Sequence, residues 1–181
     1  MSQTLISRKD LESTKDQMPN IEVLSKLHDR SSFDCGVESL NDFIKKYAFQ
    51  YQKKNICQVF VTTIASKVTG FYTLSPKSIN ISVLPKKEAK KLPKHPVLVI
   101  HLGRLAVCES VKGKGLGEFL LMDAIARVLK VSQDIGAYAL EVVAINEKAA
   151  SFYGRYGFQS LQDDMLHMFL SIKTIRKLPL L

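Results

Sequence analysis

The sequence of 181 residues has no tryptophan, only three cysteines and no long apolar run. Cys35, Cys57 and Cys108 are odd in number and lack CxxC spacing, which argues against a disulfide framework or a zinc site. We therefore expect reduced thiols and no bound metal. No stretch approaches the roughly 20 apolar residues that span a bilayer, and the polar N-terminus lacks the apolar core of a signal peptide. These absences predict a cytoplasmic protein without a membrane partner.

Acidic residues are also few relative to basic ones. Lysine and arginine number 26 against 17 aspartates and glutamates, which gives a net charge of +9. Such an excess attracts polyanions, although a basic surface can also serve solubility alone. No helix-turn-helix or zinc-finger spacing is present that would read DNA bases. The charge therefore favours a nucleic acid or an acidic partner.

The length fits one domain. We expect residues 1–20, which are polar and without periodicity, to form a flexible arm, and residues 21–181 to form a single domain. Strands are predicted at residues 21–27, 57–65, 71–74, 97–107, 137–144 and 165–172, with a turn at 67–70. Helices are predicted after Asp34 and at residues 116–131 and 147–156, while residues 75–96 read as a loop or short helix. Strands that alternate with helices predict an α/β or α+β domain.

The first predicted helix begins at Asp34 as N-cap and buries one apolar face. That face consists of Val37, Leu40, Ile44, Tyr47 and Tyr51.

Residues 112–117, which follow the apolar run 97–107, form a glycine-rich loop before a helix. Glycines at 113, 115 and 117 allow a tight turn and close approach of a ligand. The amides that begin the helix favour phosphate, and Lys112 and Lys114 add full charges. The spacing is neither GxGxxG nor GxxxxGK[ST]. A turn that merely joins strand to helix is the alternative, so this loop alone predicts no more than phosphate binding.

A second block, NEKAASFYGRYGF at residues 146–158, follows the predicted strand 137–144. Together the two blocks resemble the GNAT acetyltransferase superfamily, whose pattern is [QR]xxGx[GA] at a helix start and then NxxAxx[FL]YxxxGF. Lys112 stands where Gln or Arg is usual. The resemblance implies a mixed, twisted sheet with splayed central parallel strands flanked by helices, and acetyl-CoA as co-substrate in the gap.

The resemblance also implies roles for individual residues. The backbone of residues 105–107 would pair with pantetheine and offer an oxyanion donor, residues 112–117 would hold the pyrophosphate, and Asn146 and Ala149 would line the far side. The implied cofactor-binding residues are Leu105, Ala106, Val107, Lys112, Gly113, Lys114, Gly115, Leu116, Gly117, Asn146 and Ala149. Tyr153 would be the catalytic acid, since a phenol with a pKa near 10 is protonated at neutral pH. Its alternative is a packing role.

No general base stands out. Glu109 and Glu141 are the carboxylates nearest the motifs, and His95 and His101 are further candidates. A missing base favours an acceptor that hardly needs one. An α-amino group, with a pKa of about 7.7–8.0, is partly neutral at pH 7, whereas a lysine amine at about 10.4 is not. An α-amine on a polyanion, such as aminoacyl-tRNA, fits this chemistry and the positive charge.

Three further blocks sharpen the resemblance. Residues 34–44 (DCGVESLNDFI), 70–75 (GFYTLS) and 102–107 (LGRLAV) resemble the GNAT toxins of bacterial toxin–antitoxin pairs, which acetylate aminoacyl-tRNA and block translation. The resemblance implies a tRNA-binding face with Lys45, Lys46, Lys94 and Arg104. It also implies a homodimer, a ribbon–helix–helix antitoxin, and operator DNA bound only through the toxin–antitoxin complex. The competing hypotheses are acetylation of a protein N-terminus or small amine, and an inert GNAT-like binding module.

Overall fold

The computed structural model describes residues 19–179, so the predicted arm lies outside the described residues except for its last two positions. Seven strands form one sheet in the order β1-β2-β3-β4-β5-β7-β6. The strands are β1 (Ile21–Val23), β2 (Gln58–Ile64), β3 (Lys67–Ile79), β4 (Val97–Val107), β5 (Ala139–Val143), β6 (Gln159–Ser160) and β7 (His167–Ser171). The helices are α2 (Glu38–Asp42), α3 (Ala48–Lys53), α4 (Lys86–Ala89), α5 (Leu116–Asp134), α6 (Glu147–Gly154) and α7 (Ile172–Ile175). Single helical turns of other pitch are η1 (Phe43–Tyr47), η2 (Ile81–Val83) and η3 (Glu109–Val111).

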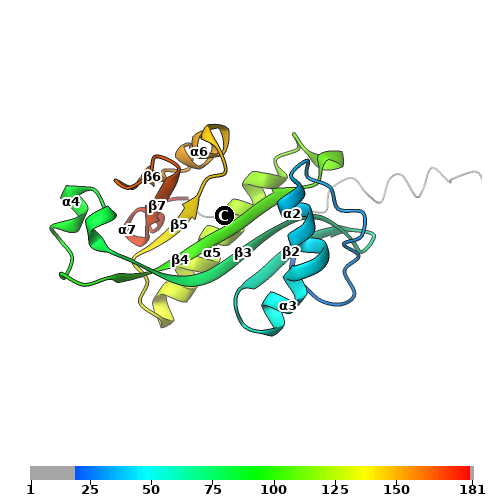
Figure 1. The fold of residues 1–181 in the computed structure, drawn as a ribbon, viewed down its shortest axis with the longest axis horizontal. Coiled ribbons are helices and arrows are strands. Elements are labelled where there is room, and N and C mark those ends of the chain that lie inside the picture. The colour runs from blue at the N-terminus through cyan, green and yellow to red at the C-terminus, as the bar shows by residue number, and fades with distance from the viewer. Residues whose placement is uncertain (1–18, 180–181) are drawn as a thin grey trace, which may run out of the picture.

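Helices cover both faces of the sheet. The long helix α5 lies behind the sheet in Figure 1, where it packs on a core that includes Tyr72, Leu102 and Leu140. On the opposite face, α2 and α3 cover a second cluster around Phe71, and α4 covers a third around Phe169. Since α2 and α4 stand at opposite ends of that face (Figure 1), the middle of β4 lies between them without a helix over it.

The two central strands, β4 and β5, separate beyond Leu102 and Val142, their last paired residues. β4 and β5 are parallel and pair only from Ile100 with Leu140 to Leu102 with Val142. Just beyond, the register between β3 and β4 shifts, which leaves Gly103 as an extra residue in β4. A bulge of this kind bends the strand and increases its twist. β4 continues to Val107 without β5 beside it, and the predicted splay of central parallel strands is confirmed.

The first helix differs from its prediction. Val37 occupies the N-cap position, while the Asp34 carboxylate accepts hydrogen bonds from Gly36 N and Asn41 Nδ2. The predicted cap is therefore wrong. The predicted apolar face is confirmed for Val37, Leu40 and Ile44, but it ends there because the π-helical turn η1 interrupts the 3.6-residue period. Phe43 and Ala48 are also buried, whereas Tyr47 and Tyr51 are 48% and 36% exposed.

The hairpin and the connection after it also differ. The turn predicted at residues 67–70 lies at Ala65 and Ser66, which both have positive φ. Its β-branched residues Val68 and Thr69 belong to β3, which runs on to Ile79. The segment predicted as a loop or short helix therefore begins as strand and only then forms η2 and α4. The strand predicted at 97–107 is confirmed with the same bounds.

Candidate active site

A cleft of about 780 Å³ opens where β4 and β5 part. Its walls are the end of β4, the loop before α5, the first turns of α6 and the start of α2. It brings together all the residues predicted to bind the cofactor except Lys114, and Tyr153 lines it too. The lining residues among those predicted are Leu105, Ala106, Val107, Lys112, Gly113, Gly115, Leu116, Gly117, Asn146, Ala149 and Tyr153.

The end of β4 offers unpaired backbone donors to this cleft. Cys108 N donates to Thr69 O on β3 at 2.8 Å. Because successive amides of a strand point to opposite sides, the N–H groups of Leu105 and Val107 point away from β3, toward the gap. Strand β5 does not reach them. These donors can bind an extended, amide-bearing ligand in the manner of an added strand.

The glycine loop exposes its backbone groups to the cleft, with no side chain of another residue packed over Gly113 or Gly115. Gly113 and Gly115 have φ of +78° and +79°, a region that glycine adopts without strain. No atom lies within 4 Å of a Cβ placed on either residue, so the backbone conformation, not a lack of space, requires glycine there. Gly115 is the N-cap of α5 and makes no side-chain cap. The first amides of α5 are therefore open to an anion.

The two lysines of the loop do not add free charge to the cleft. Lys112 Nζ pairs with the Glu109 carboxylate and donates to Cys35 O at 3.2 Å. Lys114 is exposed and does not line the cleft. Gly36, with φ of +78°, lies against the Glu109 carboxylate, and a Cβ there would be 2.7 Å from Oε1. This contact cannot be predicted from the sequence, because Gly36 and Glu109 lie far apart in the chain, although the DCG block holds the glycine that permits it.

Helix α6 carries Tyr153 into the cleft. Asn146 caps the helix by accepting from Ala149 N at 2.9 Å. Tyr153 is 7% exposed, between the rings of Phe152 and Phe158. Within residues 19–179 its hydroxyl has no hydrogen-bond partner, yet no fully buried side-chain N or O atom there is unpaired, so the hydroxyl reaches the cleft. Burial raises the pKa of Tyr153 to about 12, which keeps the phenol protonated.

The four candidate bases lie in different surroundings. His95 is exposed in the segment after α4, and Glu109 is paired with Lys112. Glu141 on β5 is 0% exposed and accepts from Lys77 Nζ at 2.8 Å and from His101 Nδ1 at 2.5 Å. Burial acts to raise the pKa of Glu141, but the hydrogen bonds from His101 and Lys77 outweigh it and lower the pKa to about 2. Such a carboxylate is too weak a base to take a proton from an amine.

The predicted tRNA-binding residues do not form one cluster. Arg104 stacks its guanidinium 3.7 Å from the centre of the Phe43 ring, beneath η1. Lys45 and Lys46 are exposed on the same turn, and Lys46 pairs with Asp42 at 2.7 Å. Lys94 is exposed near α4, which lies at the opposite end of this face from α2 (Figure 1). Any acceptor that touches all four residues must extend across the face.

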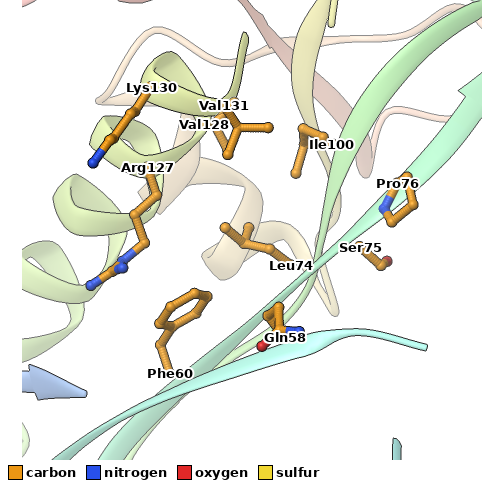
Figure 2. A pocket seen from close by; sticks show the side chains of 10 residues that line it. All are labelled: Gln58, Phe60, Leu74, Ser75, Pro76, Ile100, Arg127, Val128, Lys130 and Val131. Carbon is orange, nitrogen blue, oxygen red and sulfur yellow. The ribbon is translucent and has the colours of Figure 1, made fainter. Parts of the chain in front are cut away.

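A second, smaller cavity lies between strands β2 to β4 and the C-terminal half of α5. Figure 2 shows that its lining is largely apolar, with Arg127 and Lys130 as the charged residues among the ten that it labels. Its volume is about 270 Å³. None of the residues predicted to bind the cofactor or to act as the catalytic acid lines it. Elsewhere in residues 19–179, no set of His, Cys, Asp and Glu is placed to hold a metal, and no helix has the length and apolarity to span a bilayer.

Residues 55–160 match the family model of the acetyltransferase (GNAT) domain. A curated relative from Mycobacterium tuberculosis, the tRNA-acetylating toxin, is 36% identical over 155 residues, which cover 86% of this chain and 93% of the relative. The crystal structure of a KacT mutant is 33% identical with a TM-score of 0.84, over 89% of this chain and 99% of that one. The structure of AtaT with acetyl-methionyl-tRNAfMet is 32% identical with a TM-score of 0.82, over 87% and 96%.

Two further solved structures contain partners. An AtaT mutant bound to the C-terminus of the antitoxin AtaR and acetyl-CoA is 28% identical with a TM-score of 0.74, over 88% of this chain and 97% of that one. The AtaT–AtaR complex bound to DNA is 29% identical with a TM-score of 0.71, over 87% and 97%.

Proposed function

This chain belongs to the GNAT acetyltransferase family, and we propose that it is a toxin that moves the acetyl group of acetyl-CoA to the α-amine of aminoacyl-tRNA. Acetylation of that amine blocks translation. The observation that carries the proposal is the cleft between β4 and β5, which unites both GNAT motifs in a chain similar along most of its length to a tRNA-acetylating toxin.

Each wall of the cleft has a part in this reaction. The N–H groups of Leu105 and Val107 hold the pantetheine arm, and one of them stabilises the oxyanion that forms at the acetyl carbonyl. The open amides of α5 hold the pyrophosphate. Tyr153 donates its proton to the departing sulfur, since its raised pKa keeps the phenol neutral.

The acceptor is a polyanion that reaches the cleft across a basic surface. Arg104, Lys45, Lys46 and Lys94 contribute to its binding, in line with the net charge of +9. Their separation on the face suits an extended backbone of phosphates better than a single small anion. Binding through phosphates predicts that the KM for tRNA rises steeply with salt, because bound counterions are released on association.

The related complexes point to partners for this chain as well. We infer a homodimer, neutralised by a ribbon–helix–helix antitoxin whose C-terminal segment covers the cleft, and operator DNA bound only through that complex. The reaction takes place in the bacterial cytoplasm, where charged tRNA is found.

One assay tests the function. The protein is incubated with labelled acetyl-CoA and total charged tRNA, and mass analysis of the released aminoacyl-adenosines identifies the acetylated species. Wild type should label at least one species, and Tyr153→Phe should lose about 100-fold or more in rate while acetyl-CoA still binds. If Tyr153→Phe inhibits growth as wild type does, the chain acts as an inert binding module and the proposal fails.

A charge-reversal pair distinguishes tRNA from a small amine or a protein N-terminus. Lys45→Glu with Arg104→Glu should abolish tRNA acetylation yet leave acetyl-CoA affinity within about threefold. Lys130→Glu, on the far side of the sheet, is the matched control and should acetylate tRNA as wild type does. Unchanged turnover in the double variant would favour an acceptor without phosphates.

A further inference from the structure

Side chains from three strands converge on the buried carboxylate of Glu141. Lys77 reaches it from β3, His101 from β4 and His167 from β7. The carboxylate is 0% exposed, so it has no contact with water and depends on these donors. It is thereby fixed as an ionised acceptor in the middle of the sheet.

The two imidazoles use this carboxylate differently. In His167, Nε2 hydrogen-bonds to the Glu141 carboxylate and Nδ1 hydrogen-bonds to Asp163 Oδ2 at 2.8 Å, so both ring nitrogens have a partner. In His101, only Nδ1 hydrogen-bonds to the Glu141 carboxylate, at 2.5 Å. An ionised carboxylate can only accept, so Nδ1 carries the hydrogen and the lone pair of the neutral ring lies on Nε2. No atom within residues 19–179 hydrogen-bonds to Nε2 of His101.

His101 stands at the closed end of the gap between β4 and β5. Its register partner is Glu141, one position before the last pair of the two strands. The free edge of its ring faces Gly103, where a Cβ would lie 3.4 Å from Nε2. The side chain is 25% exposed, on the face that carries α2 and α4. The bulged glycine therefore leaves the basic nitrogen uncovered at the point where the strands separate.

His101 does not itself line the cofactor cleft, and the spacing along β4 relates the two. At about 3.3 Å per residue, Leu105 lies only two positions, or roughly 7 Å, beyond the bulge. The acceptor amine must lie within this interval, between the imidazole edge at Gly103 and an acetyl group held by the amide of Leu105. The glycine loop follows the other end of this stretch and faces the phosphates.

We propose that Nε2 of His101 accepts the proton of the acceptor's α-ammonium group, while Glu141 fixes the ring as a positioning residue. This assignment rests on the proposed function. The ammonium gives one proton to Nε2, and the neutral nitrogen bonds to the acetyl carbon. The carbon–sulfur bond breaks, the sulfur takes the Tyr153 proton, and the second nitrogen proton restores the phenol. The imidazole then releases its proton to solvent.

The test compares the two imidazoles. His101→Asn retains an amide donor near the place of Nδ1 but has no basic nitrogen, and His167→Gln retains a donor near the place of Nε2. Initial rates are measured from pH 6.5 to 9 on a tRNA whose aminoacyl group is amide-linked, so that alkaline hydrolysis does not interfere. Acetyl-CoA affinity and the melting temperature are measured for each variant, and the charged groups facing His101, namely Glu141, Lys77 and His167, are unchanged in His101→Asn.

His101→Asn should lose about 10-fold in kcat/KM at pH 7, because only about a tenth of an α-amine with a pKa of about 8 is neutral there without a base. The deficit should shrink toward pH 9, because an α-amine with a pKa of about 8 is then neutral without a base. His167→Gln should keep the wild-type pH profile. Recovery at high pH is a result that a purely structural defect cannot give.

A wild-type rate and pH profile in His101→Asn would overturn the assignment, as would a loss equal at every pH. Should that variant fail to fold, His101→Gln, which also lacks a basic nitrogen, is judged by the same profile. Failure of the proposed function looks different, since wild type itself would then leave charged tRNA unacetylated.

Discussion

The glycine loop (residues 112–117) and the Glu141 cluster (Lys77, His101, Glu141 and His167) both lie near the point where β4 and β5 separate. They differ in what they are made of. The loop consists of exposed backbone, with two glycines at positive φ and no side chain over them. The cluster consists of side chains around a carboxylate that is 0% exposed. A site made of amides depends on backbone conformation and tolerates loss of a nearby charge. A site made of buried polar side chains depends on each partner, since an unpaired buried group costs free energy.

The largest effect should come from the cluster. Glu141→Ala leaves Lys77, His101 and His167 without their shared acceptor, and breaking a buried ion pair in this way costs about 3–5 kcal/mol. For a chain of this size the melting temperature should fall by about 10 °C. Lys91→Ala is the control, since its exposed pair with Glu88 is worth about 1 kcal/mol or less. Equal melting temperatures for the two variants would mean that the cluster does not hold the sheet together.

Acid should weaken the cluster selectively. The pKa of Glu141 falls from its usual 4.5 to about 2 in the folded protein, so the folded state favours the ionised form. This contribution, roughly 3 kcal/mol, is fully present above pH 4.5 and is lost as the pH falls toward 2. Urea unfolding at pH 7, 4 and 3 measures it as a decline in the free energy of unfolding. Glu141→Gln should flatten that decline, and an unchanged slope would contradict the ionised, donor-held carboxylate.

The same contrast explains what the sequence could predict. The loop is contiguous, and its glycine spacing predicts both a tight turn and an anion site; the φ values of Gly113 and Gly115 confirm the turn. The strand at 97–107 can likewise be predicted from its continuous apolar run, and the helix after it from the 3.6-residue spacing of its apolar residues. The Glu141 cluster was not, because its members lie at positions 77, 101, 141 and 167 and meet only through strand register. Glu141 and His101 can be predicted from the sequence only as separate candidates, because no sequence pattern pairs them.

A substitution that disturbs the backbone conformation of the glycine loop should lower either the stability of the protein or its affinity for acetyl-CoA. Gly115→Ala places a Cβ on a residue at φ +79°, which costs about 1–2 kcal/mol. If the loop keeps its shape, stability falls by that amount; if it relaxes, acetyl-CoA affinity falls about 5- to 30-fold. Gly136→Ala is the matched control, since φ there is not positive, no atom would lie within 4 Å of its new methyl group, and the residue does not line the cleft. Calorimetric titration with acetyl-CoA and thermal melts of both variants separate the two outcomes.

The smallest effect should follow removal of the loop's most conspicuous charge. Lys112→Met deletes a cation whose Nζ is already neutralised by Glu109, in a pair that is half exposed on both sides. Exposed pairs contribute about 1 kcal/mol or less, so acetyl-CoA affinity should change by less than about threefold. A loss of tenfold or more that grows at low salt would instead mean that Lys112 leaves Glu109 to bind the pyrophosphate. Glu109→Gln distinguishes these cases, because it frees the lysine: affinity should then rise if the charge can reach the phosphates, and stay constant if the backbone amides alone bind them.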